Sequence, residues 1–515
     1  MDFIILLPGI LSGLTGIGLC ISSFADHRRM NPLRDEGEIN TKEHKTEGGA
    51  ETAGVHLISA GVLILSAVLA LYMAWSGERS LVLFYFMDEI PIYFHIDALG
   101  RLFITMISLI WTAVCIYAFV YMKHEGEEKR FFGFYLLVYG ILTALCFAGN
   151  LVTFYFFYEL MTLCSAPLVL HNGSKEAIMA ALKYIFYSML GAYLALFGIY
   201  FLYHYCDTLT FTAGGTLNTA LAAENNGILL VAVFLMIIGF GTKAGMLPFH
   251  AWLPTAHPVA PAPASAVMSA VIVKAGVLAV IRSIYYIVGP YFIKGTWVQT
   301  AWLTLSLVTV FMGSLLAYRE NVFKKRLAYS TVSQVSYIMF GLALLTRRGI
   351  HGALLHVVFH AFIKCALFLT AGIFISRTGK TKADEYVGIG KQQPLTLWAY
   401  TFASLALIGI PPTSGFVSKW YLAMAALWSN TAGIFQFLGP AVLLVSALLT
   451  AGYLLPITMK GFLPGEDLEV EAKKEPIDKM TVVLLILAAV TLLLGIRPNS
   501  LISYGVSLIA AEAFQ

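Results

Sequence analysis

The chain has 515 residues, of which 59% are hydrophobic and 12% are charged, and its formal net charge is +4. Soluble domains have about 25% charged residues, so this composition excludes a soluble globular protein and predicts a polytopic membrane protein. The six cysteines are scattered and form no CxxC motif, so neither a zinc site nor an iron–sulfur cluster is indicated, and we expect no cofactor or metal.

Fourteen apolar stretches follow one another along the chain, and each is long enough to cross a hydrocarbon core of about 30 Å as a helix of about 20 residues. They are centred near residues 13, 64, 110, 140, 160, 192, 238, 275, 307, 336, 362, 408 (continuing past a break to about 428), 444 and 488. We therefore predict an all-α membrane protein with about 14 transmembrane helices. The first stretch lacks the features of a signal peptide, so we expect it to be retained.

The whole chain, 1–515, is predicted to form a single membrane domain without a soluble module. The longest polar stretch, 25–54, mixes both charge signs with glycine and threonine, and it has too few apolar residues to form a core. We expect it to be a flexible cytoplasmic loop.

Basic residues are distributed unevenly between the two sides of the predicted bundle. Of the 33 lysines and arginines, 21 lie in loops after odd-numbered helices and 7 lie on the other side. The positive-inside rule then places the odd loops in the cytoplasm and both termini outside it. The remaining five cations lie within apolar stretches or at breaks in them: Lys183, Lys243, Lys274, Lys364 and Lys419.

Two predicted helices, the seventh and the twelfth, are interrupted by glycine and proline. The interruptions are 241–248 and 409–415, and they lie five helices apart. This spacing indicates two five-helix repeats, helices 4–8 at 125–290 and helices 9–13 at 298–457. Because each repeat has an odd number of spans, the second is inverted relative to the first, as in many transporters. The alternative is that both interruptions are unrelated kinks.

Glu159 lies within a wholly apolar stretch, where a charge costs roughly 2.5–3.5 kcal/mol unless it is paired or hydrated. Its natural partner is a buried lysine, and Lys243 and Lys183 are the candidates. A static ion pair that holds helices together is one interpretation. However, the five lysines outnumber the acids available at this depth, so the unmatched amines must be hydrated or neutral, as a proton relay requires.

Helix 11 carries a stripe of three ionisable residues, His356, His360 and Lys364, spaced four residues apart. They share one helix face and advance by about 6 Å per step, which suits proton transfer through short water bridges. The alternative is that each histidine binds a backbone carbonyl. His250 and His257 flank the first interruption and could line a water-filled access route, or they could be interface residues.

Four segments together carry a specific resemblance to a known family, which extends over about 90–430. They are 241–282, with Leu-Pro-Phe-His-Ala-Trp-Leu-Pro at 247–254, and 325–334, 356–364 and 408–416. In these segments the chain resembles the antiporter-like membrane subunits of respiratory complex I and of Mrp-type Na⁺/H⁺ antiporters. It looks most like the D-type Mrp subunit and its relatives in membrane-bound hydrogenase-like complexes.

The resemblance implies 14 helices with inverted repeats and a glutamate on helix 5 paired with a lysine on broken helix 7, here Glu159 and Lys243. It also implies a central lysine on helix 8, here Lys274, and the helix 11 stripe. The ionisable group of broken helix 12 falls on Lys419, where some members have glutamate. Such subunits assemble with other membrane subunits and are driven by a peripheral redox arm or a counter-ion gradient.

We therefore expect a proton-translocating subunit of a multisubunit complex in the cell membrane of a prokaryote. The predicted relay consists of Glu159, Lys183, Lys243, Lys274, His356, His360, Lys364 and Lys419. No redox, hydrolytic or nucleic-acid site is indicated, and lysines do not coordinate Na⁺, which we expect to cross elsewhere in the complex. The host remains open between an Mrp antiporter, a hydrogenase-like or sulfur-reducing complex and a complex I relative. The alternatives are a self-sufficient secondary transporter and a haem-binding redox subunit.

Overall fold

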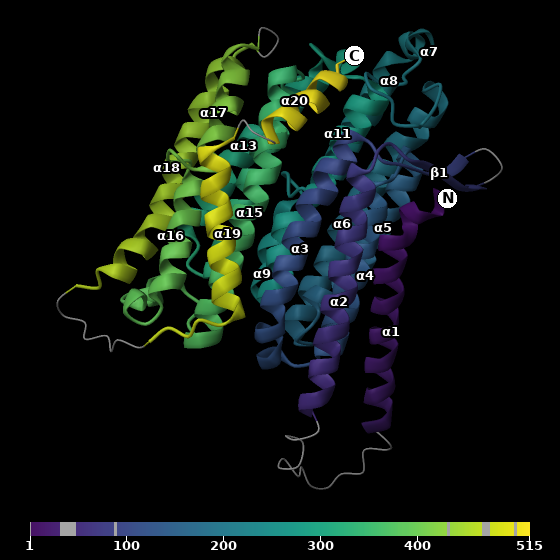
Figure 1. The fold of residues 1–515 in the computed structure, drawn as a ribbon. Coiled ribbons are helices and arrows are strands. Elements are labelled where there is room, and N and C mark those ends of the chain that lie inside the picture. Colours follow the sequence, from purple (N-terminus) through teal and green to yellow (C-terminus); the bar gives the residue numbers. More distant parts are fainter. Residues whose placement is uncertain are drawn as a thin grey trace.

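The computed structural model describes residues 2–30, 48–86, 90–429, 433–465, 474–498 and 502–514. Across these ranges the chain is mostly helical, and its long helices run side by side between two ends of the molecule (Figure 1). Twelve helical segments in the described part are long and apolar enough to cross a membrane.

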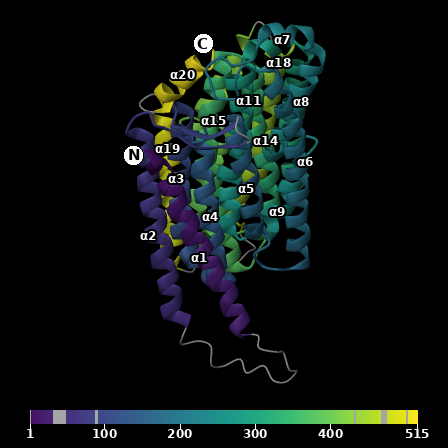
Figure 2. The same cartoon turned by 90° about the vertical axis from the view of Figure 1, so that its right-hand side faces the viewer.

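The first half of the chain begins with a 3₁₀ turn, Asp2–Leu6, and forms most of one side of the bundle (Figure 2). Its helices are α1 (Leu7–Met30), α2 (Gly48–Trp75), α3 (Ala98–Glu125), α4 (Glu128–Cys146), α5 (Leu151–Val169), α6 (Lys175–Tyr205), α7 (Thr219–Glu224) and α8 (Asn226–Lys243). Because α1 and α2 extend into both ends of the stretch 25–54, the prediction that all of it is a loop is wrong. Residues 31–47 lie outside the described residues.

A short irregular segment follows α8 and leads into the centre of the bundle. It contains a 3₁₀ turn, His250–Trp252, and α9 (Leu253–Val259). The central span comes next and consists of α10 (Ala262–Val267), a π-helical turn (Met268–Ile272), α11 (Val273–Ser283) and a second π-helical turn (Ile284–Val288), and α12 (Pro290–Ile293) follows it. The span from Ala262 to Val288 is continuous and entirely buried. Surrounding helices therefore shield this span from lipid on every side.

The second half of the chain packs against this central span. Its helices are α13 (Trp297–Arg319), α14 (Phe323–Ala343), α15 (Arg347–Thr378), α16 (Pro394–Ile408), α17 (Ser414–Leu427), α18 (Phe435–Phe462), α19 (Lys479–Ile496) and α20 (Ile502–Glu512), with 3₁₀ turns at Ala383–Tyr386 and Ile389–Lys391. Twelve of the fourteen apolar stretches predicted from the sequence coincide with the twelve segments that could cross a membrane, while the stretch near 336 contains α14 and the stretch near 408 contains the α16–α17 pair. The final helix α20 was not predicted.

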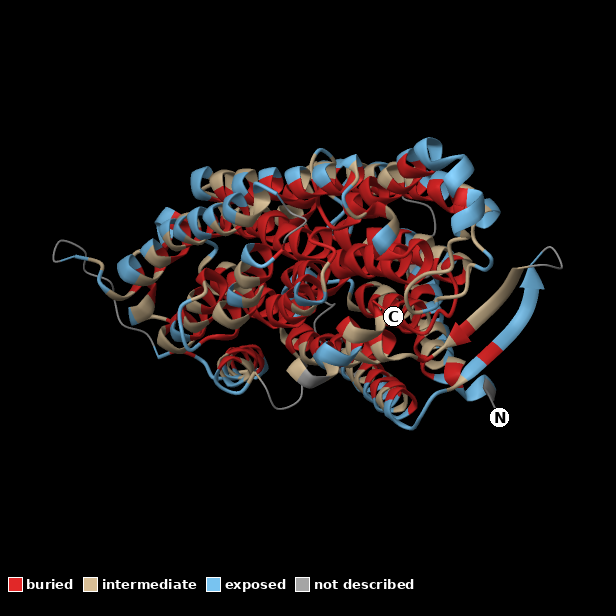
Figure 3. Cartoon of the chain, turned by 90° about the horizontal axis from the view of Figure 1, so that it is seen from above, coloured by how far each residue is buried: buried red, intermediate tan, exposed pale blue. Residues whose placement is uncertain are grey.

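Buried residues are concentrated in the middle of the bundle, and exposed residues lie along the outer helices (Figure 3). Many of the exposed residues are large and apolar. Leu14, Phe186 and Leu448, on three different outer helices, are 65%, 63% and 65% exposed. A water-soluble protein would not leave such large apolar side chains exposed over several helices. The surface therefore suits lipid, and the chain is a multi-pass membrane protein.

Two features near the start of α3 were not predicted. A two-stranded antiparallel hairpin, β1 (Ser80–Phe86) and β2 (Ile90–His95), connects α2 to α3. At the end of this connection Asp97 caps α3 by accepting a hydrogen bond from Gly100 N at 2.8 Å, and it forms a bidentate ion pair with Arg282. Arg282 is not among the five cations predicted to lie within apolar stretches, but it is buried inside α11.

Candidate functional site

Lys243 is the last residue of α8, and its amine is fully enclosed. Its Nζ donates to three hydroxyl groups: Thr162 Oγ1 at 2.7 Å, Tyr184 OH at 2.9 Å and Ser188 Oγ at 3.1 Å. Three acceptors match the three donors of an ammonium group. All of them are neutral, so the hydrogen bonds satisfy the amine without neutralising its charge.

Glu159 lies on α5, one helical turn before Thr162, and is partly buried. Its Oε1 has no hydrogen-bond partner, and within the described ranges the carboxylate forms no ion pair closer than 4.0 Å. The expected direct pair with Lys243 or Lys183 is therefore absent. The hydroxyl of Thr162 takes the place of the carboxylate at the Lys243 amine, although the two opposite charges still interact electrostatically.

Lys183 points away from Lys243, toward the irregular segment after α8. It is half-buried, and its Nζ donates to Thr255 Oγ1 of α9 at 3.0 Å. Its charge acts on His250, whose Nδ1 is buried without a partner. The adjacent residue Tyr184 faces Lys243, and successive helical residues point about 100° apart. The structure thus places Lys183 beside the interruption and not beside Glu159.

Lys274 and Lys364 lie on neighbouring central helices, and both side chains are completely buried. Lys274 Nζ donates to the carbonyl of Ser269, in the π-helical turn that precedes α11, at 2.6 Å. Lys364 Nζ donates to Leu327 O at 2.9 Å and to Ser330 Oγ, both on α14. These acceptors are also neutral, so neither amine has a carboxylate at hydrogen-bonding distance among the described residues.

Lys243 and Lys274 belong to adjacent helices that pack unusually closely. A Cβ added to Gly276, two residues after Lys274, would lie 2.7 Å from Phe240 O and 3.0 Å from Lys243 Cβ. Close approach of two backbones is a usual reason for glycine inside a helix. This contact joins the Glu159 side of the bundle to the central lysine.

His356 and His360 stack on one face of α15, with ring centroids 5.7 Å apart and planes 19° apart. His356 Nδ1 shares a hydrogen bond of 2.8 Å with Ser418 Oγ of α17, and its ring also stacks on Tyr337 of α14. Neither ring nitrogen of His360 has a partner, nor does Nε2 of His356. The stripe predicted for helix 11 is present, and neither imidazole is held by a backbone carbonyl.

Lys419 lies on α17 and reaches back to the end of α16. Its Nζ donates to Leu407 O at 2.6 Å and to Ile408 O at 3.0 Å, and it lies 5.0 Å from the centre of the Tyr337 ring. A cation is favoured at a helix C-terminus, where unpaired carbonyls concentrate negative partial charge. The Tyr337 ring therefore has both Lys419 and His356 as neighbours.

His257 is the second ionisable residue of the interruption, and it is fully buried. Both of its ring nitrogens lack partners, and its ring stacks on Phe368 at 4.6 Å. Its charged neighbours are Lys364 and Lys324. Lys324 is not among the five cations predicted to lie within apolar stretches, but it is buried and donates to Ala260 O at 2.9 Å. The interface position considered for His257 is therefore wrong for this residue.

The structure brings most of the predicted residues into one electrostatic neighbourhood. The charged or ionisable groups that act on His360 are Lys274, His356, Lys364 and Lys419. Sequence reasoning missed Tyr337, Ser418 and Lys324, which come from other helices. The fold and this site define the class of the protein: a multi-pass membrane protein that encloses ionisable side chains between its spans.

Comparison with known proteins identifies the family. Residues 148–446 match the model described as NADH:quinone oxidoreductase/Mrp antiporter, TM, and residues 87–132 match that of the N-terminus of chain 5 of complex I NADH-ubiquinone oxidoreductase. The chain belongs to the NADH:quinone oxidoreductase/Mrp antiporter family and is an antiporter-like membrane protein. The resemblance inferred from the four motif segments is thus confirmed.

Individual relatives cover most of the chain. It is 32% identical to NADH-quinone oxidoreductase subunit N of Desulforudis audaxviator, over 82% of each chain. It is 28% identical to the D-type component of the Na⁺/H⁺ antiporter of Alkalihalophilus pseudofirmus, over 86% of this chain and 88% of the relative. A chain of the archaeal membrane-bound sulfane sulfur reductase has the same fold, with a TM-score of 0.82 at 22% identity over 99% and 98% of the two chains. These relatives do not favour a haem protein or a self-sufficient transporter.

Proposed function

We propose that this chain is a proton-translocating subunit of a larger membrane complex. The observation that carries the proposal is the set of enclosed amines, those of Lys243, Lys274 and Lys364, bound to hydroxyls and carbonyls instead of carboxylates. A charge at this depth is expensive and is found mainly on ion pathways. Names of the relatives, which include a subunit of an oxidoreductase and a subunit of an antiporter, support a role within an assembly.

The neutral acceptors support a change of protonation state at each amine. A hydroxyl or carbonyl oxygen accepts a hydrogen bond from both –NH₃⁺ and –NH₂, so losing a proton does not require the side chain to move. Glu159 is the switchable counter-charge in this scheme. Its ionised form favours the charged form of Lys243, and its protonation favours release of a proton from Lys243. Lys274, whose helix packs closely against Lys243, is the next proton acceptor.

From Lys274 the proton passes to the helix 11 stripe and then to Lys419. Neutral imidazole both accepts and donates a proton, and the unpartnered nitrogens of His356 and His360 leave both functions available. Tyr337 and Ser418 hold His356 in position beside Lys419. Lys183, His250 and His257 lie around the interruption and would line the access route from one side of the membrane.

We also propose the finer architecture expected from the sequence: 14 transmembrane helices, with inverted repeats at 125–290 and 298–457. The end of α8 at Lys243 and the end of α16 at Ile408 support it, because a non-helical segment follows each. We further propose that the protein lies in the cell membrane of a prokaryote and that both of its termini are on the extracytoplasmic side. H⁺ is the ion that crosses this chain, because amines bind protons and do not coordinate Na⁺.

The first test replaces Glu159 with glutamine and, separately, Lys243 with alanine in the chain within its host complex. Both variants should assemble at close to wild-type levels and lose H⁺ translocation, measured with a pH-sensitive dye in inverted membrane vesicles. Lys325→Gln is the control, because Lys325 lies near the start of α14 and pairs with Glu320 at 2.7 Å, away from the relay. Loss of assembly with both variants would favour a static structural role instead.

A further inference from the structure

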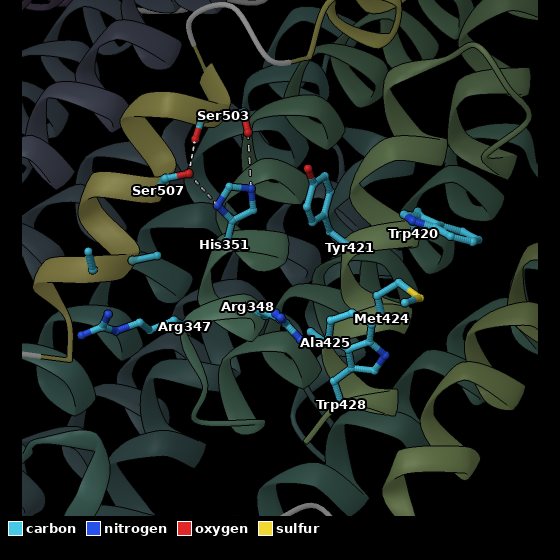
Figure 4. A pocket seen from close by; sticks show the side chains of 12 residues that line it. Arg347, Arg348, His351, Trp420, Tyr421, Met424, Ala425, Trp428, Ser503 and Ser507 are labelled. Carbon is cyan, nitrogen blue, oxygen red and sulfur yellow. Dashed lines mark hydrogen bonds between the residues drawn. The ribbon is translucent and has the colours of Figure 1, made fainter. Parts of the chain in front are cut away.

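A cavity of about 700 Å³ lies at one end of the bundle, between the start of α15, the end of α17 and α20 (Figure 4). Arg347 and Arg348 line it as the first two residues of α15, and Trp428, which follows α17, also lines it. No aspartate or glutamate of the described chain lines this cavity. It contains none of the relay residues.

The two arginines have no acidic partner in the described part of the chain. Both are exposed, and neither forms an ion pair or a hydrogen bond with a described residue. The Arg348 guanidinium lies 4.0 Å from the centre of the Trp428 ring, which orients its plane without neutralising its charge. Two unpaired guanidinium groups beside a cavity without carboxylates repel cations and attract an anion. This charge pattern does not suit an exit for H⁺ or Na⁺.

The position of the cavity indicates what kind of anion it takes. α15 begins at Arg347 and is long and apolar enough to cross a membrane, so a cavity at its first turn is expected near the level of the lipid headgroups. Trp420 and Trp428 line it and are 56% and 59% exposed. Tryptophan favours this interfacial level because its ring is apolar and its N–H is polar. The same cavity thus offers positive charge for a phosphate and apolar aromatic surface for acyl chains.

We propose that this cavity binds the headgroup of an anionic phospholipid. Guanidinium groups match the geometry of phosphate oxygens, so Arg347 and Arg348 would hold the phosphodiester. Ser507 of α20, which shares a hydrogen bond of 3.3 Å with His351 in the cavity, offers a hydroxyl to the headgroup. The acyl chains would lie along Trp420 on the exposed face of α17. The bound lipid would bridge α15, α17 and α20.

The test uses the chain within its purified complex, reconstituted in phosphatidylcholine nanodiscs. Brominated phosphatidylglycerol or brominated phosphatidylcholine is added as a quencher of tryptophan fluorescence. The quenching that arises in the cavity is the difference between the quenching of the wild type and that of a Trp420→Phe/Trp428→Phe variant. We expect half-maximal quenching at a concentration of phosphatidylglycerol at least tenfold lower than that of phosphatidylcholine. Arg347→Gln/Arg348→Gln should abolish this preference.

Two further variants separate charge and fold from a specific site. Arg79→Gln/Lys294→Gln removes the same charge outside the cavity and should leave the preference intact. Arg347→Lys/Arg348→Lys should restore most of it. Equal quenching by both lipids, or an unchanged preference in the glutamine variant, would overturn the proposal. Loss of quenching on addition of inorganic phosphate would also overturn it, because the site would then bind free phosphate.

Discussion

At the scale of single residues, the bundle contains two kinds of buried charge. Asp97 and Arg282 form a direct bidentate pair, whereas Lys243 binds three hydroxyls. Burial alone would raise the pKa of Asp97, but the charge and hydrogen bonds of Arg282 and the hydrogen bond from Gly100 N outweigh it and hold that pKa below its usual value. Asp97 therefore stays ionised at neutral pH, as a structural pair requires.

The Asp97 pair predicts a pH dependence of stability. A carboxyl group with a lowered folded-state pKa contributes stability that is fully present above its unfolded pKa, about 3.9, and is lost as pH falls through the folded value. We expect the melting temperature of the detergent-solubilised protein to fall more steeply below about pH 4 in the wild type than in Asp97→Asn. An equal slope in both proteins would contradict this account.

The same pair predicts the effect of truncating one partner at neutral pH. Arg282→Ala leaves the Asp97 carboxylate without its partner, which should destabilise the fold by about 3–5 kcal/mol. The yield of folded protein and its melting temperature would measure the loss. Glu159→Gln is the matched comparison, since Glu159 has no ion-pair partner among the described residues, and its melting temperature should stay close to that of the wild type. Equal destabilisation by both variants would contradict the distinction between the Asp97–Arg282 structural pair and the Glu159 carboxylate, which has no ion-pair partner among the described residues.

At the scale of elements, the connection between α16 and α17 depends on glycine. Gly409 has a φ of +92°, and a Cβ on Gly415 would lie 1.8 Å from Ala406 O. We expect Gly415→Ala to push α17 off α16 and to destabilise the protein by at least about 1–3 kcal/mol, measured by thermal unfolding. The control is Gly18→Ala on α1, where a Cβ would meet no atom within 4 Å. A Gly415→Ala protein as stable as the control would contradict the packing described.

The long helices could be predicted from the sequence because a span must be about 20 apolar residues, whatever its neighbours are. The β1–β2 hairpin was missed because Ser80–Phe86 is short, and a short apolar run does not reveal its period. The ends of the polar stretch 25–54 were missed because composition does not show where a helix extends beyond the membrane. Helix α20 has 11 residues and is too short to appear as a span.

Individual ionisable residues of the site could be predicted because they lie within apolar stretches, but their positions relative to one another could be predicted only where they share a helix. His356, His360 and Lys364 follow from their spacing, because four residues make about one turn. Tyr337 and Ser418 could not be found this way, since they reach His356 from α14 and α17 and carry no charge that marks them. Direct contact between Glu159 and Lys243 is absent for a related reason: two of the three hydroxyls that bind the Lys243 amine come from another helix, α6.

At the scale of the whole molecule, the apolar surface and the family lead to an expectation about assembly. The protein extracted in mild detergent should migrate with other membrane subunits in native electrophoresis, and mass spectrometry should identify them. Migration of the chain alone, with H⁺ transport activity retained after reconstitution, would contradict its role as a subunit.

We propose that protons cross the bilayer on amines enclosed in the middle of this bundle. The most direct test measures H⁺ translocation by the assembled complex in vesicles after Lys364→Met, which keeps the length of the side chain and removes its proton-binding amine. The account predicts a complex that still assembles and a rate of H⁺ translocation reduced at least tenfold, while Lys325→Gln stays near the wild-type rate. A Lys364→Met complex that translocates H⁺ at the wild-type rate would contradict the account, because the buried amines would then be fixed structural groups.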